Sequence, residues 1–191
     1  VTWETGSAPT RLVGVISQNV DGLHREAGQR RLIDLHGRIA DVVCLGCRDV
    51  SSRADLQERL RAVNPHVADL PNVGHAELRP DGDAVVDDWA DFAIVACVRC
   101  GGVLKPDVVF FGESAPRERV ERATAWVDEA ESLLVAGSSL TVMSGLRFVR
   151  QAARRGIPVL IVNQGATRGD DLATLRLEAG TTEVLSSLVS A

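Results

Sequence analysis

A group of polar and turn-forming residues follows directly on an apolar run near the start of the chain. The run covers residues 12–16, and the residues that interrupt it are Ser17, Gln18, Asn19, Asp21 and Gly22. In an open α/β sheet the ligand crevice lies outside the carboxyl ends of the strands, so amides and a carboxylate there point toward a ligand. The pattern therefore predicts a buried strand that ends in a binding site.

Two histidines lie close behind this group. His24 and His36 flank a short stretch with helical character, and only His36 is followed by glycine, Gly37, which lets backbone approach closely. Histidine titrates near neutral pH and is the commonest general acid or base. His36 is therefore the candidate acid/base residue, and a structural histidine in a polar loop is the alternative.

The cysteines form a second candidate site, because all four fall in two pairs, Cys44-x-x-Cys47 and Cys97-x-x-Cys100. Four thiolates in two short knuckles supply the tetrahedral sulfur set that structural zinc prefers. The span between the pairs, residues 48–96, exceeds the roughly 15–20 residues of a compact zinc ribbon. The pattern predicts structural zinc, with reduced free thiols or a redox pair as alternatives.

Composition limits the classes of function. A chain of 191 residues with 45% hydrophobic content can bury one large domain or a domain with a small insert. Its net charge of −5 argues against direct binding of nucleic acid, which needs a basic face. The sequence shows no apolar run long enough for a membrane span and no secretory leader, so we expect a cytoplasmic protein without membrane partners.

Strand and helix patterns alternate along the chain. Strands are expected at residues 11–16, 38–43, 132–136 and 157–162, and helices at 53–63, at 117–131 and in a segment that ends near 155. This order predicts an α/β fold with a doubly wound parallel sheet, Rossmann-like in organisation. We expect residues 1–43 and 105–191 to build that domain and residues 44–104 to form an inserted zinc module. Residues 48–96 contain more acidic residues than arginines, and the resulting net charge of this segment equals that of the whole chain, −5.

A dinucleotide-binding fold opens with a strand, a glycine-rich turn and a helix, and no such turn precedes residue 11. We therefore expect the Rossmann-like domain to be incomplete at its N-terminal side. The sheet should show a gap or an exposed apolar edge beside one of its strands, and Asn19, Asp21 and His36 should line a cleft open on one side.

Several strings together resemble the sirtuin family, the NAD-dependent protein lysine deacylases. They are QNVDGLH at residues 18–24, the His-Gly pair at 36–37, the cysteine pairs, and KPDVVFFGE at 105–113. The resemblance covers essentially the whole chain and is greatest to the class II branch. The string LTVMSGLRF at 140–148 departs from the commoner family pattern, which has a proline there, so the acyl group stays open.

The resemblance implies the roles of individual residues. Asn19 and Asp21 would orient the ribose and the carboxamide, Gln18 would hold ribose hydroxyls, and His36 would be the general base. The NAD contacts implied are Gln18, Asn19, Val20, Asp21, Gly137, Ser138, Ser139, Asn163, Gln164, Gly165 and Thr181. The residues implied to flank the substrate acyl-lysine are Val109, Phe110, Gly112 and Glu113. By their residue types alone, the turns at 137–139 and 163–165 are also ordinary turns, and 105–113 is also an ordinary strand.

The implied activity is removal of an acyl group from lysine of protein substrates, with NAD consumed and nicotinamide and O-acyl-ADP-ribose formed. Zinc would be structural, held by Cys44, Cys47, Cys97 and Cys100. One alternative is mono-ADP-ribosyl transfer to protein in the same cofactor pocket. Another is an inactive, zinc-stapled fragment or binding module, which we would expect to bind NAD weakly.

Overall fold

The computed structural model describes residues 12–69 and 91–190 and divides into two compact units. The first unit contains Val1–Gly37 and Val108–Ala191, and the second contains Arg38–Asp107. The segment predicted as a zinc module, 44–104, lies inside the second unit. Residues 1–11, which include the start expected for the first strand, and residues 70–90 of the acidic segment lie outside the described residues.

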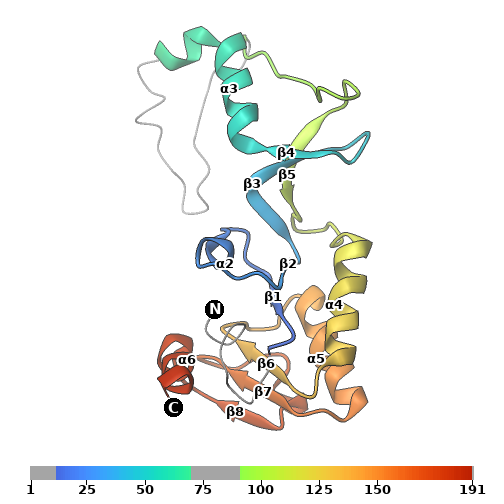
Figure 1. Ribbon diagram of the computed structural model, residues 1–191, viewed down its shortest axis with the longest axis vertical. Coiled ribbons are helices and arrows are strands. Elements are labelled where there is room, and N and C mark those ends of the chain that lie inside the picture. Colours follow the sequence, from blue (N-terminus) through green and yellow to red (C-terminus); the bar gives the residue numbers. More distant parts are fainter. Residues whose placement is uncertain (1–11, 70–90, 191) are drawn as a thin grey trace. The chain divides into compact units, whose positions relative to one another are not determined.

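The first unit contains two parallel sheets (Figure 1). In one, β1 (Val15–Ser17) pairs in parallel with β2 (Leu32–Asp34). In the other, β6 (Leu133–Ala136), β7 (Val159–Val162) and β8 (Leu175–Leu177) are parallel neighbours in that order. The α/β fold class with parallel sheets is therefore confirmed. Within the described residues β1–β2 and β6–β7–β8 are separate sheets, and the expected gap beside one of the strands stays a prediction.

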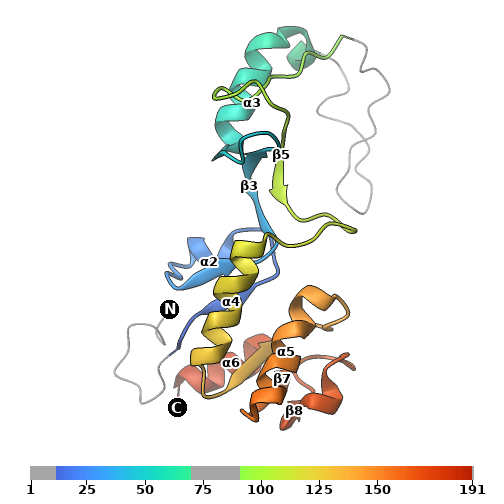
Figure 2. The same cartoon turned by 90° about the vertical axis from the view of Figure 1, so that its right-hand side faces the viewer.

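Helices cover both sides of β6–β7–β8. The helices of this unit are α2 (Leu23–Glu26), α4 (Arg117–Glu129), α5 (Met143–Arg155) and α6 (Thr181–Ser190), with a 3₁₀ turn at Asp170–Leu172. In Figures 1 and 2, α4 and α5 lie on one side of the sheet and α6 on the other. This is the two-sided covering of a doubly wound sheet.

The core of the first unit is built around α5. Its apolar residues recur at helical spacing and form one buried stripe: Gly145, Leu146, Phe148, Val149 and Ala152. The stripe packs with buried residues of α4 and β7, such as Val127 and Ile161. Each large side chain buried in this way contributes roughly 1.5–3 kcal/mol of transfer free energy. This packing fixes the first turn of α5, which contains Ser144.

The second unit has a three-stranded sheet in the order β4–β3–β5. Its elements are β3 (Gly37–Cys44), β4 (Val50–Ser52), α3 (Arg53–Val63), a 3₁₀ turn at Pro65–Asp69 and β5 (Leu104–Val108). The predicted helix at 53–63 is confirmed, since α3 has these bounds. It begins there because the Ser52 side chain accepts hydrogen bonds from the N–H groups of Ala54 and Asp55. β5 contains Pro106 and lies at the edge of its sheet, where a residue without a backbone N–H is tolerated.

Several expected boundaries differ from the structure. β1 begins at residue 15 and includes Ser17, β6 begins at 133, β7 begins at 159, and α4 ends at 129. The helix-like stretch between His24 and His36 was wrong, since His24 lies inside α2 and β2 fills the second half of the interval. Buried Leu32 and Ile33 pair with β1 there, and that pairing with a partner strand is not visible in the local sequence. None of the described helices is long and apolar enough to span a membrane.

Candidate functional site

Three turns in the first unit follow the carboxyl ends of parallel strands. Residues 18–21 follow β1, residues 137–139 follow β6, and residues 163–165 follow β7. These are the positions at which open α/β sheets bind ligands. All three turns contain residues that the sequence assigned to the cofactor.

Gln18 links the first of these turns to the second. The Ser138 hydroxyl donates to Gln18 Oε1 at 3.0 Å. The same side chain lies against the first turn of α5, because a Cβ built on Gly145 would be 2.7 Å from Gln18 Oε1. Gly145 therefore leaves the space that Gln18 occupies.

His36 is held at both ring nitrogens. Its Nδ1 lies 3.1 Å from the backbone carbonyl oxygen of Gln18, and its Nε2 lies 2.7 Å from the Ser144 hydroxyl. A carbonyl oxygen only accepts, so Nδ1 carries the proton, and in the neutral ring Nε2 then accepts from Ser144. This tautomer leaves the lone pair of the imidazole on Nε2, as a general base requires.

Ser144 was not among the predicted residues. It is 108 positions from His36 and lies in the first turn of α5. No local pattern marks it, because a serine near the start of a helix is ordinary. Only the packing of α5 against the sheet reveals its partner.

Asn19 and Asp21 are exposed, and both take part in local turns. Asp21 Oδ1 accepts from the N–H of Leu23 at 3.0 Å at the start of α2, and the Asn19 N–H donates to Ser17 Oγ at 3.2 Å. Val20 is half-buried. The side chains assigned to ribose and carboxamide thus lie at the surface, and their roles toward a ligand stay predictions.

The turn after β6 is suited to an anion. Gly137 has φ of 65° and Leu140 has φ of 55°, so the turn contains a left-handed residue other than glycine. The Leu140 side chain is buried. Within the described residues, the backbone N–H groups of Ser138 and Ser139 have no hydrogen-bond partner. Free amides in such a turn can hold a phosphate group. Thr181, at the start of α6, adjoins Gly137, since a Cβ built there would lie 3.3 Å from Thr181 Cγ2.

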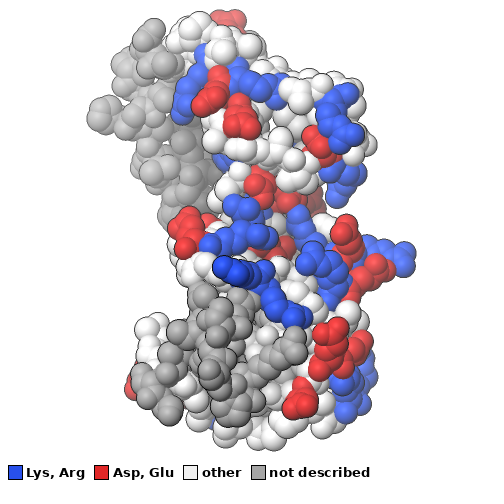
Figure 3. Space-filling model, in the orientation of Figure 1, with Lys and Arg blue, Asp and Glu red and all other residues white. Residues whose placement is uncertain are grey.

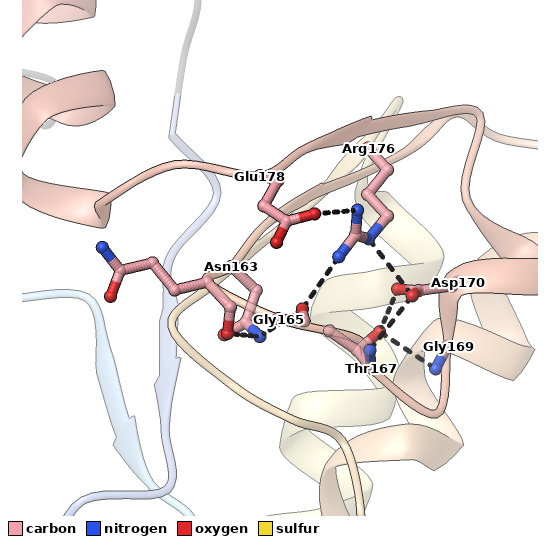
Figure 4. A network of polar contacts seen from close by, with 8 residues as sticks. Asn163, Gly165, Thr167, Gly169, Asp170, Arg176 and Glu178 are labelled. Atoms are coloured by element: carbon pink, nitrogen blue, oxygen red, sulfur yellow. Dashed lines mark hydrogen bonds and ion pairs between the residues drawn. The ribbon is translucent and has the colours of Figure 1, made fainter.

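The turn after β7 is closed by its own polar network (Figure 4). Asn163 Nδ2 donates to the carbonyl oxygens of Gln164 at 2.9 Å and Gly165 at 3.0 Å. Arg176 on β8 donates to the same Gly165 carbonyl at 2.9 Å. The turn is visible in the sequence, whereas the part that Arg176 plays in it is not.

Arg176 is in turn held by two carboxylates, Asp170 at 3.1 Å and Glu178 at 3.1 Å. Hydrogen bonds from Thr167 and the nearby guanidinium hold the pKa of Asp170 below its usual value. The hydrogen bond that Arg176 donates to Glu178 raises the pKa of Arg176, an effect that burial opposes and Asp170 strengthens. The network therefore holds the 163–165 turn through the hydrogen bond from Arg176 to the Gly165 carbonyl.

The segment assigned to the substrate adjoins His36. The Val109 N–H donates to the His36 carbonyl at 2.9 Å. Phe110 and Glu113 close a turn, in which the Glu113 N–H donates to the Phe110 carbonyl at 3.0 Å and Glu113 Oε2 accepts from the Phe110 N–H at 3.1 Å. Gly112 has φ of 89°, which this turn requires.

The second unit brings the four cysteines together. All four Sγ atoms lie within 4.8 Å of one another, with Cys44 and Cys100 at 3.5 Å and Cys47 and Cys97 at 3.8 Å. A disulfide would need about 2.05 Å, whereas Zn–S bonds of about 2.3 Å in a tetrahedron separate the sulfurs by about 3.8 Å. The cysteines are therefore positioned to bind zinc, and the redox pair is not favoured.

The surrounding backbone shapes this cluster. Each knuckle is followed by a residue in the left-handed region, Arg48 at φ 62° and Gly101 at φ 72°. A Cβ on Gly102 would lie 2.9 Å from Cys44 Sγ, so glycine is needed for backbone to pass this close to the sulfurs.

The thiols of the cluster differ in pKa. The backbone N–H of Cys47 is the main cause that lowers the pKa of Cys44 to about 6. The Asp49 N–H lowers the pKa of Cys47, but the Cys100, Cys44 and Cys97 side chains and burial raise it to about 12. Successive ionisation of neighbouring thiols is costly without a cation, and a bound metal would convert all four to thiolates.

The family of the chain follows from residues 4–144, which match the model of the Sir2 family. The chain belongs to the Sir2 family. It is 56% identical over 178 residues to "NAD-dependent protein deacetylase 1" of Mycobacterium avium (strain 104), a match that covers 93% of this chain and 63% of that protein. It is also 56% identical over 168 residues to "NAD-dependent protein deacetylase 1" of Streptomyces coelicolor, covering 87% of this chain and 55% of that protein.

Solved Sir2 structures share the fold. "Sir2 bound to acetylated peptide" has a TM-score of 0.69 at 26% identity and covers 93% of this chain and 62% of that one. "Sir2-p53 peptide-NAD+" has a TM-score of 0.67 at 27% identity over 93% and 62% of the two chains. The sirtuin resemblance is thus confirmed, and the class II branch stays a prediction. The chain spans between half and two thirds of the curated relatives it matches.

Proposed function

We propose that the complete gene product is an NAD-dependent protein lysine deacylase that forms nicotinamide and O-acyl-ADP-ribose. The observation that carries the proposal is the pair of hydrogen bonds at the His36 ring, which directs the Nε2 lone pair to the Ser144 hydroxyl in the first turn of α5. The same chain is 56% identical to a protein named as an NAD-dependent deacetylase.

The residues of the first unit fit NAD. The free N–H groups of Ser138 and Ser139 would bind a phosphate, and the Gln18 amide would reach ribose hydroxyls. The Asn163 turn would hold the adenosine ribose, with Thr181 toward the adenine. When bound, NAD supplies a ribose carbon that carries a cationic leaving group. The chain then has to orient the ring, exclude water and accept a hydroxyl proton at His36 Nε2.

We place the protein substrate at residues 109–113. Val109 is hydrogen-bonded to the backbone of His36, so an extended peptide along this segment would bring its acylated lysine toward the base. A related structure is described as bound to acetylated peptide. The size of the acyl group is left to experiment, because the 140–148 string departs from the commoner family pattern.

Other partners of the chain stay predictions. On the face shown in Figure 3, both basic and acidic side chains of the described residues are visible. The proposal that the chain does not bind nucleic acid directly rests on its net charge of −5. A cytoplasmic location is likewise proposed from the sequence alone.

The test compares His36→Ala with the matched control His24→Ala in the complete gene product. His24 is exposed on α2, outside the proposed site. With labelled NAD and acylated peptides, mass spectrometry should detect O-acyl-ADP-ribose. Losing a positioned base should lower turnover about 100- to 10,000-fold, and His24→Ala should not. Turnover of His36→Ala within threefold of wild type would reject the assigned role. Labelled product found only as protein-bound ADP-ribose would replace deacylation by mono-ADP-ribosyl transfer.

A further inference from the structure

The Nε2 atom of His36 is already occupied by a side chain of this protein. Ser144 Oγ lies 2.7 Å away, within hydrogen-bond distance. The group that a ligand hydroxyl would meet at this base is therefore the serine hydroxyl. A proton relay through Ser144 accounts for this geometry, because the ligand does not have to displace the serine from His36 Nε2.

A serine hydroxyl can take part in a relay because it donates one hydrogen bond and accepts two. Its single donor is directed to His36, since the Nδ1 proton of the imidazole is fixed on the Gln18 carbonyl. Within the part of the chain that the structure describes, Ser144 Oγ has no other side-chain or backbone partner. Its acceptor capacity is therefore available to a ligand.

The position of Ser144 is fixed by its neighbours. It lies in the first turn of α5, and the next two residues, Gly145 and Leu146, are buried. Gly145 also contacts the Gln18 side chain, which accepts from Ser138. Ser144 is thus held between the base and the turn that we assign to the cofactor.

We propose that Ser144 is a catalytic relay between a ribose hydroxyl and His36, an inference that rests on the proposed function. Ser144 Oγ accepts the proton of the ribose hydroxyl while its own proton passes to His36 Nε2. One O–H bond of the ligand and one of the serine break, and one new Oγ–H bond and one Nε2–H bond form. The serine is unchanged at the end, the imidazole becomes a cation, and the ligand oxygen becomes the nucleophile.

Three variants of the complete gene product test the relay. Ser144→Ala removes the hydroxyl, and Ser144→Thr restores one. As a control, Ser187→Ala removes the hydroxyl of an exposed serine on another helix, α6. The first readout is the ¹⁵N spectrum of the His36 ring in protein without NAD. In Ser144→Ala the Nε2 resonance should move toward that of an unbonded imidazole nitrogen while Nδ1 stays protonated. Ser144→Thr and Ser187→Ala should leave both unchanged.

The second readout is turnover in mixtures of H₂O and D₂O. Ser144→Ala should lower kcat about 100-fold with KM nearly constant, at the lower end of what a positioned proton-transfer group contributes. A plot of the wild-type rate against the deuterium fraction should be curved, because two protons move in the relay. The same plot for Ser144→Ala should be linear. Ser144→Thr should recover the curve.

An unchanged Nε2 resonance in Ser144→Ala, or wild-type solvent isotope behaviour in that variant while deacylation proceeds, would overturn the relay alone. A wild-type protein that forms no O-acyl-ADP-ribose would overturn the proposed function and the relay together.

Discussion

Gly145→Ala should separate the stability of the fold from its affinity for NAD. Alanine in the first turn of α5 reduces the entropy lost on folding, a gain of about 0.5–1 kcal/mol. The Cβ of the introduced alanine would lie 2.7 Å from Gln18 Oε1 and 2.9 Å from Gln18 Nε2, so the Gln18 side chain has to move. The hydrogen bond from Ser138 at 3.0 Å is then lost, at about 0.5–1.5 kcal/mol.

These two effects nearly cancel, so the free energy of unfolding should change by less than about 1 kcal/mol. Binding of NAD should suffer more, because displaced Gln18 no longer reaches the ribose hydroxyls. Loss of one such hydrogen bond, about 1.4 kcal/mol, raises Kd about tenfold. Thermal unfolding and calorimetric titration of the complete gene product with NAD measure the two quantities separately.

A double-mutant cycle tests the route of the effect. In a Gln18→Ala background, Gly145→Ala has no side chain to displace and should stabilise the fold by about 0.5–1 kcal/mol without changing Kd for NAD. If Gly145→Ala weakens NAD binding equally in both backgrounds, Gln18 does not transmit the effect. A loss of several kcal/mol in the free energy of unfolding would show that the gap beside Gly145 is rigid.

The remaining predictions concern the zinc cluster and the Asp170 network. Elemental analysis should find one zinc per chain, and Cys97→Ser should reduce the metal content and the melting temperature; four titratable thiols with little zinc would contradict this. Arg48→Gly should raise the free energy of unfolding by up to about 1 kcal/mol, and Gly101→Ala, at the equivalent position of the other knuckle, should lower it by about 1–2 kcal/mol, both in chemical denaturation. Because the pKa of Asp170 is lowered in the folded chain, its stabilisation is complete above about pH 4 and is lost as pH falls through the folded value. Asp170→Asn should therefore lower stability at neutral pH and flatten its decline in acid, whereas Asp171→Asn, an exposed neighbour, should do neither; equal unfolding curves for the two variants would refute the assignment.

Elements with strong local signals were predictable from the sequence. The end of the helix at 53–63 follows from the Asn64-Pro65 pair behind it, and the structure has those bounds. The cysteine pairs indicated their chemistry by spacing alone, because a knuckle needs only a few neighbouring residues. The turn at 18–21 was found because polar residues follow an apolar run, whereas the roles of the turns at 137–139 and 163–165 were implied by the family resemblance.

Other features depended on contacts between distant residues. β2 and β8 are three residues long, too short for a periodic pattern, and exist because a parallel neighbour supplies their hydrogen bonds. In the sequence Arg176 looks like an ordinary surface arginine, and only the structure shows its contacts with Asp170 and Gly165. In each case the contacts with a partner strand or loop stabilise the arrangement, and the local sequence does not show where that partner lies.

The sequence by itself determined the candidate base, because a His-Gly pair beyond a polar strand end is visible in neighbouring residues. Only the tertiary structure decided which nitrogen of His36 carries the proton and which side chain meets the other. Those bonds come from the Gln18 carbonyl at the end of β1 and from Ser144 in α5, elements brought together by burial of the α5 stripe against the sheet. Packing across more than a hundred residues sets hydrogen-bond geometry, and residue type alone cannot.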